Sequence, residues 1–183
     1  MKKHILGMII ATGFLMGCQS TSDDSTSSII DTPTIESFVN YHNDELAQFV
    51  TSDIGSIAKT NDEIILLLNG DKSFDSGSTE VKEESKTVLS QLAKLLNDKP
   101  ESEVFIAGHT DSRGSKQFNI SLSNKRADSV LALLAEQGVD STRINTYGFG
   151  EEEPIASNMN SDGRKKNRRI EIRITPIIEL FEE

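Results

Sequence analysis

Apolar and polar positions divide the second part of the chain into strands. A short apolar run at 64–68, closed by Asn-Gly, predicts a buried strand, and a second run at 104–107 predicts another. In 169–174, isoleucines alternate with arginine and glutamate, which predicts a strand with one buried and one exposed face. A further strand is expected around 143–147.

Two amphipathic helices are predicted between these strands, because apolar residues recur there every three or four positions. The first begins near Ser78 and ends before Pro100, and the second runs over about 119–137. A helix that connects two strands favours a right-handed crossover, so we expect the first two strands to be parallel neighbours. Together these elements predict an α/β domain over 61–176, of βαβαβ type, built as an α+β two-layer sandwich.

The segment 35–60 also carries apolar side chains at helical spacing, with asparagines and acidic residues on the opposite side. It predicts a helix with a break near Gly55. Two interpretations are open from the sequence. The apolar side can pack on the domain that follows, or it can bind a protein partner or a second copy of the chain.

The N-terminus has the features of an export signal. A short positive region precedes an apolar run at 5–17, which is too short to span a bilayer and predicts a signal peptide over 1–17. The run ends at Cys18, the single cysteine, in a sequence similar to the lipidation site of bacterial lipoproteins. An aspartate directly after the lipidated cysteine retains lipoproteins in the inner membrane. This chain has Gln19 at that position, so we expect an outer-membrane lipid anchor.

The polar segment 18–34 is rich in Ser, Thr and Asp and predicts a disordered tether that keeps the domain close to the membrane, facing the periplasm. Residues 177–183 form a short C-terminal tail. The chain has 19 Lys and Arg against 29 Asp and Glu, a formal net charge of −10. Such an acidic protein is a poor partner for nucleic acid.

His109 is the one residue that suggests catalysis or a metal site. After the predicted signal peptide is removed, the only other histidine is His42, in a different segment, so zinc lacks a set of ligands. No sequence motif of a nucleophilic serine is present. We therefore expect no cofactor, no metal and no enzymatic activity.

Binding chemistry is predicted in the loop that follows the second strand. In open α/β sheets ligands gather at the carboxyl ends of strands, where Asp111 lies in a loop with two glycines. On the next helix Arg126 shares a face with Asn119, Leu122 and Val130. A charge on this mostly apolar face needs a partner. Either Arg126 pairs with Asp111 and joins helix to loop, or the two residues bind opposite charges of one ligand.

One pattern of residues extends over most of the second half and resembles the OmpA-like C-terminal domain, a family that holds bacterial outer membranes to the peptidoglycan wall. The resemblance implies a mixed sheet with helices on one face and non-covalent binding of a peptidoglycan stem peptide. It rests on Gly108-His109-Thr110-Asp111, Asn119, Leu122-Ser123, Arg126-Ala127, Gly138-Val139, Arg143-Ile144, Gly148, Gly150-Glu151, Pro154-Ile155-Ala156, Asn158, Gly163-Arg164 and Asn167-Arg168-Arg169-Ile170-Glu171-Ile172.

The resemblance also implies roles for single residues. Arg126 and Asp111 match the pair that binds the carboxylate and the ammonium of diaminopimelate, because a guanidinium can bind a carboxylate bidentately. The supporting polar residues and apolar walls are Thr110, Asn119, Leu122 and Phe74. Two members of a basic cluster at 164–169 also match family positions near the site, namely Arg164 and Arg168. The cluster itself is either a solvated helix face or a contact for acidic wall polymer.

The resulting hypothesis is an outer-membrane lipoprotein that tethers the membrane to diaminopimelate-type peptidoglycan. An alternative is an adaptor subunit of an envelope or secretion complex. In that case the 35–60 helix binds a protein partner, and wall binding is accessory.

Overall fold

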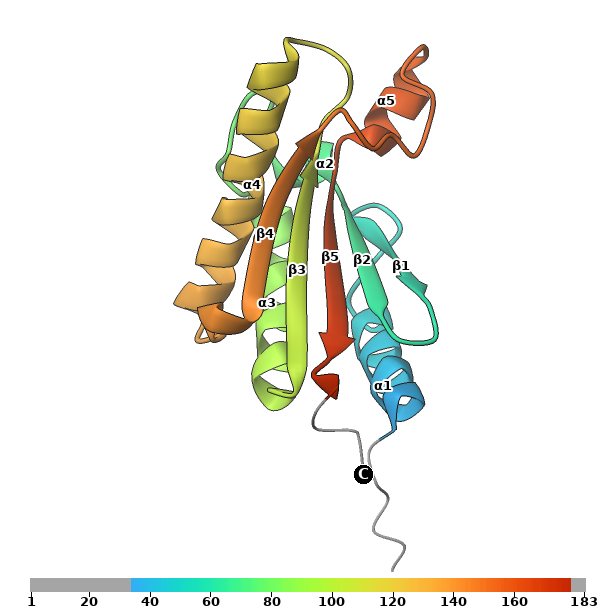
Figure 1. Ribbon diagram of the computed structural model, residues 1–183, viewed down its shortest axis with the longest axis vertical. Coiled ribbons are helices and arrows are strands. Elements are labelled where there is room, and N and C mark those ends of the chain that lie inside the picture. The colour runs from blue at the N-terminus through green and yellow to red at the C-terminus, as the bar shows by residue number, and fades with distance from the viewer. Residues whose placement is uncertain (1–33, 179–183) are drawn as a thin grey trace, which may run out of the picture. The chain divides into compact units, whose positions relative to one another are not determined.

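The computed structural model describes residues 34–178, and five strands in this part of the chain form one mixed sheet (Figure 1). The strand order is β1-β2-β5-β3-β4. β5 is antiparallel to both of its neighbours, whereas β3 and β4 are parallel. The strands are β1 (Gly55–Lys59), β2 (Ile64–Asn69), β3 (Ser102–His109), β4 (Ile144–Gly150) and β5 (Arg169–Pro176). The predicted mixed α/β architecture is therefore confirmed.

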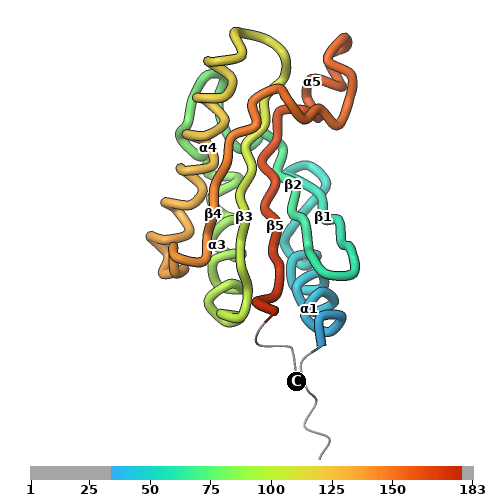
Figure 2. The backbone as a smooth tube through the Cα atoms, in the orientation of Figure 1, coloured from blue at the N-terminus to red at the C-terminus, as the bar shows by residue number. Residues whose placement is uncertain are grey.

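β2 and β3 have the same direction, but they are not neighbours, so that prediction was wrong. β5 lies between them (Figure 2), and Ile172 is paired with Leu66 of β2 on one side and with Ile106 of β3 on the other. All three side chains are fully buried. The connection between β2 and β3, which contains two helices, thus crosses over the position of one strand. The last strand, with its row of isoleucines, occupies that position.

The helices are α1 (Ile35–Ala47), α2 (Gly70–Ser73), α3 (Glu83–Asp98), α4 (Lys116–Glu136) and α5 (Ser161–Asn167), with a 3-10 turn at Ser141–Arg143. α3 starts later than predicted, with Lys82 as its N-cap, because 70–82 forms the short helix α2 and a loop. Ser115 caps α4 by accepting a hydrogen bond from the backbone of Phe118. None of the helices within residues 34–178 is long and apolar enough to cross a membrane.

The first part of 35–60 is the helix α1. It begins with a capping box, in which the side chains of Thr34 and Ser37 each accept a hydrogen bond from the backbone N–H of the other residue. Its apolar side is buried with the rest of the core through Phe38, Val39 and Leu46. The second part was predicted wrongly, because 55–59 is not helical but forms the edge strand β1 beside β2. α1 therefore packs on its own domain, and its apolar side is not available to a partner.

Candidate ligand-binding site

A cavity of about 420 Å³ lies at the end of the sheet where β2 and β3 finish and α4 begins. Its walls come from the loop after α2, the β3–α4 loop and the first turns of α4. They include every site residue predicted from the sequence except Arg164 and the lipidation residue Cys18, which lies outside the described residues. The lining residues are Asp71, Phe74, Asp75, Ser76, Gly77, Thr110, Asp111, Arg113, Phe118, Asn119, Leu122, Arg126 and Arg168.

Arg126 is a buried cation in this wall, with 6% of its surface exposed. Its Nε donates to the carbonyl of Ser78 at 2.9 Å and its Nη2 to the carbonyl of Asp75 at 3.0 Å, while its guanidinium lies 4.8 Å from the ring centre of Phe74. Within residues 34–178 no carboxylate forms an ion pair with it. Burial lowers the pKa of Arg126, and the neighbouring charge of Asp71 opposes that shift. Most of its five N–H groups stay available to a ligand.

Asp111 is held by other partners than Arg126. One carboxylate oxygen accepts from the backbone N–H of Arg113 at 2.9 Å, and the other accepts from Arg168 at 2.5 Å. The alternative in which Asp111 and Arg126 pair with each other was therefore wrong. Asp111 keeps unused lone pairs, so it can still accept from a ligand.

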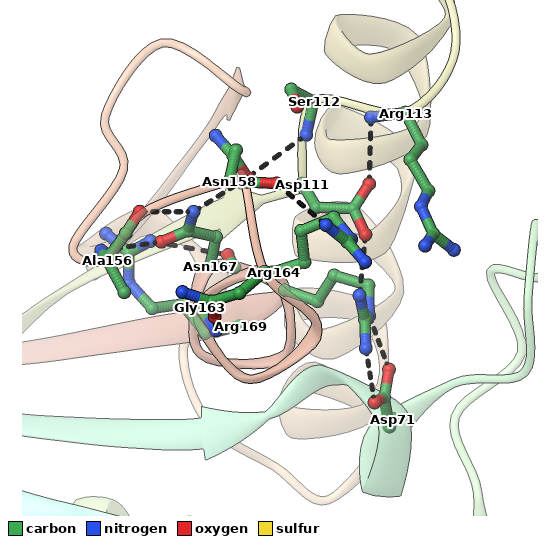
Figure 3. Close-up of polar contacts among 12 residues, drawn as sticks. Asp71, Asp111, Ser112, Arg113, Ala156, Asn158, Gly163, Arg164, Asn167 and Arg169 are labelled. Carbon is green, nitrogen blue, oxygen red and sulfur yellow. Dashed lines mark hydrogen bonds and ion pairs between the residues drawn. The ribbon is translucent and has the colours of Figure 1, made fainter.

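Arg168 connects two acidic residues at the edge of the cavity. It donates to Asp111 and also to both carboxylate oxygens of Asp71, at 2.6 and 2.7 Å. These hydrogen bonds, that of Asp71 above all, raise the pKa of Arg168, and the bond from Arg168 holds the pKa of Asp71 below its usual range. The ion-paired chain fixes the β3–α4 loop to the start of α2 (Figure 3).

Thr110 and Asn119 differ in what they offer. The hydroxyl of Thr110 is buried and has no hydrogen-bond partner among residues 34–178, although Thr110 lines the cavity. The amide of Asn119 donates to the backbone carbonyl of Asp111 at 3.3 Å and to Glu151 at 2.6 Å. Thr110 can therefore bind a ligand, whereas Asn119 holds the loop in place.

Arg164 lies beside the cavity and not in its lining. Its guanidinium donates to the backbone carbonyl of Asn158 at 2.8 Å (Figure 3). The side chain of Asn158 in turn accepts from the backbone N–H of Ser112 at 3.3 Å and from Asn167 at 2.8 Å. Arg164 thus supports the segment that holds the β3–α4 loop.

Sequence reasoning missed several lining residues. Phe118 is 53% exposed on the first turn of α4, and an aromatic residue just after a predicted binding loop was a signal for it. Arg113 lies in the predicted binding loop but was not singled out there, whereas Asp71 and Asp75 carried no signal, because their neighbours Arg168 and Arg126 in the cavity are distant in sequence.

His109 directly precedes the cavity residue Thr110 in the sequence, but its side chain is buried and does not line the cavity. It stacks on Phe149 with ring centres 5.1 Å apart, and its Nε2 lies 3.9 Å from Glu171. Burial, helped by the charge of Arg169, lowers the pKa of His109 to about 4. No group of three His, Cys, Asp or Glu side chains in the part of the chain that the structure describes could hold a metal ion.

Comparisons with known proteins find similar sequences and similar structures. The probable lipoprotein YiaD of Escherichia coli (strain K12) is 41% identical over 122 residues, which are 67% of this chain and 56% of YiaD. The chain thus matches about half the length of this relative. The cell wall anchor of the type VI secretion system of Pseudomonas aeruginosa has a similar structure, with 29% identity, a TM-score of 0.66 and coverage of 73% of this chain and 95% of the anchor.

The peptidoglycan-associated lipoprotein of Burkholderia pseudomallei is also similar, with 30% identity, a TM-score of 0.54 and coverage of 56% of this chain and 87% of that protein. The family model described as the OmpA family matches residues 73–168. This range contains all the lining residues of the cavity except Asp71. The chain belongs to the OmpA family.

Proposed function

We propose that the domain binds diaminopimelate-type peptidoglycan non-covalently. The observation that supports this most is Arg126, a buried guanidinium that lines the cavity and forms no ion pair within residues 34–178. Burying a charge without a counter-charge is costly. A ligand carboxylate would supply that counter-charge at the remaining N–H groups.

A second part of the cavity lining, around Asp111, suits a cation. Asp111 has lone pairs beyond those used by Arg113 and Arg168, and the free hydroxyl of Thr110 is its neighbour in the sequence. The side chain of diaminopimelate ends in one carboxylate and one ammonium. Such a zwitterion fits a cavity that has Arg126 on one element and Asp111 on another.

The wider role follows from the anchor predicted at Cys18. We infer a lipoprotein of the outer membrane whose periplasmic domain binds the wall and so tethers the membrane to it. A probable lipoprotein and a peptidoglycan-associated lipoprotein among the similar proteins support this role. The proposed role is binding, without hydrolysis of the wall.

Arg126→Ala tests the proposal most directly. The variant should lose sedimentation with purified diaminopimelate-type sacculi, because the ligand carboxylate loses its charged donor. Removing one partner of a buried charged pair costs about 2–5 kcal/mol, which is roughly 30- to several-thousand-fold in affinity. Sacculi of the lysine type lack this carboxylate and should bind wild-type protein much more weakly.

Arg126→Lys is the matched control, because it keeps the charge and loses the planar donor group. It should recover little binding. A purely structural role for Arg126 is the competing explanation, since its bonds to Ser78 and Asp75 join the 75–78 loop to α4. Thermal melts separate the two. Full sacculus binding by a stably folded Arg126→Ala protein would contradict the proposed site.

The alternative role, an adaptor of an envelope or secretion complex that binds its partner through 35–60, gains no support from α1, although the cell wall anchor of a secretion system is among the similar structures. The apolar residues of α1 that made docking attractive are buried in the domain's own core. Wall binding therefore remains the proposed function of the domain.

A further inference from the structure

A second hollow, of about 620 Å³, lies between α5 and the end of β2, and we call it the α5 groove. It is distinct from the ligand cavity, because the two share Arg168 and no other lining residue. Apolar and hydroxyl-bearing residues of the β1–β2 region and the 151–160 loop line it together with the lysines of α5. Its lining includes Ser52, Ser56, Leu67, Ile155, Lys165 and Lys166.

The free charge of the α5 groove is positive. Arg168 and Arg169 are already paired with acidic side chains. Lys165 and Lys166 are exposed and form no ion pair or hydrogen bond through their side chains within residues 34–178. The one acidic lining residue is Asp162. In a chain of formal net charge −10, this local excess of positive charge attracts anions.

The ligand cavity and the α5 groove share one side chain, that of Arg168, which is held in place by ion pairs. Arg168 lines both, and its guanidinium is held by Asp71 and Asp111. The two hollows therefore adjoin at Arg168, which is the place where an extended ligand would contact both. A small ligand confined to the cavity cannot contact Lys165 and Lys166.

We propose that the α5 groove is a second binding site, which takes a further carboxylate of the same wall peptide whose diaminopimelate side chain occupies the cavity. This inference rests on the proposed function. The peptide backbone and small side chains suit the polar and apolar walls of the groove, and the lysines bind the acidic group. Because both lysines are exposed, their contribution is electrostatic and decreases with salt.

The test compares two ligands on the full chain purified in detergent. Calorimetry with free diaminopimelate measures the cavity alone, and calorimetry with a soluble tetrapeptide muropeptide measures cavity and groove together. The double variant Lys165→Glu, Lys166→Glu should bind the muropeptide about three- to tenfold more weakly at low salt and free diaminopimelate as well as wild type does.

A matched control is Lys94→Glu with Lys125→Glu, which makes the same change in net charge at two exposed lysines of α3 and α4 outside both hollows. It should bind both ligands like wild type. Equal muropeptide binding by the two double variants would overturn the proposal. A second result would also overturn it: the Lys165, Lys166 variant alone loses binding of glycerol phosphate but keeps its affinity for the muropeptide. The groove would then be a phosphate site. A wild-type protein that binds neither wall ligand would instead refute the proposed function itself.

Discussion

Single buried ionisable residues set much of the chemistry of this domain, and His109 is the clearest case outside the cavity. Neither ring nitrogen has a hydrogen-bond partner among residues 34–178, and the ring stacks on Phe149. Its charged neighbours all come from β5, namely Arg169, Glu171 and Arg173. Burial works against the ionised form of Glu171, but Arg169 and Arg173 outweigh it and lower the pKa of that carboxyl.

His109 should make the protein less stable in acid. In the unfolded chain its pKa is near 6.5, and in the folded protein it is about 4. Its contribution to stability is therefore complete above pH 6.5 and is lost as the pH falls towards 4. The loss should be about 1–3 kcal/mol of the free energy of unfolding. Urea unfolding measured between pH 7 and pH 4 reports it.

His109→Phe should flatten this pH dependence, since phenylalanine keeps the stacking and does not titrate. Burial also lowers the pKa of His42, so part of the slope should remain. His42→Phe serves as the control and should leave the His109 part in place. If His109→Phe shows the same slope as wild type, this residue is not its source.

At the scale of elements, α5 and the loop before it form a support for the binding loop. Asn167 is fully buried and makes four hydrogen bonds to the 155–158 segment (Figure 3). Gly163 allows the same segment to approach, because a Cβ there would lie 1.9 Å from the carbonyl oxygen of Ser157. Asn158 then contacts the backbone of Ser112.

Asn167→Ala should therefore weaken wall binding although Asn167 does not line the cavity. Leaving several buried backbone groups without partners should lower the free energy of unfolding by about 2–3 kcal/mol. Ser161→Ala, on the exposed start of α5, is the control and should change neither property. Thermal melts and sacculus sedimentation measure the two effects. An Asn167→Ala protein that melts at a lower temperature but binds sacculi normally would show that the 155–158 segment is not needed for binding.

α1 should contribute to stability and not to partner binding. Leu46 is fully buried in the core cluster, so Leu46→Ala should cost about 2–5 kcal/mol of unfolding free energy. Tyr41→Ala, a change at a residue that is 38% exposed on the same helix, should cost much less. Urea denaturation compares them. A Leu46→Ala protein as stable as wild type would mean that α1 is not part of the folded core.

The elements with a strong apolar pattern could be predicted from the sequence, and the others could not. The isoleucines of β5 and the apolar run of β2 identified these strands, whereas 55–59 has only Ile57 and Ala58 as apolar residues and forms an edge strand whose partner, β2, was not visible. The family pattern identified seven of the thirteen residues that line the cavity. It did not predict that Arg168 pairs with Asp71 and Asp111, because these residues are 97 and 57 positions away.

For the charged residues of β5, the alternating pattern was misleading. Arg169 and Glu171 were expected on an exposed face, but both are buried. Arg169 donates to the backbone carbonyl of Glu153, so the 151–160 loop covers this end of the face. An alternating strand predicts two faces and does not show what covers the second one.

At the scale of the whole molecule, the predicted membrane anchor is Cys18, which lies outside the described residues. Cys18→Ser should prevent acylation and leave an unprocessed or soluble species, since stable anchoring needs two lipid signals or more. Fractionation of the envelope after digestion of the wall measures this. A Cys18→Ser protein that still remains with the outer membrane after digestion would refute the lipid anchor. Arg126→Ala provides the converse control, because it should stay in the membrane fraction.

The central position of β5 has a consequence for the order of folding. β5 follows all the other described strands in the sequence, yet it joins the β1–β2 pair to the β3–β4 pair. Until it is added, the two halves of the sheet have no common hydrogen bonds, and the Asp71–Arg168–Asp111 connection cannot form. Such long-range pairing is slow. If the predicted signal peptide directs export from the N-terminus, the cavity would therefore be complete only after the last strand has crossed the inner membrane.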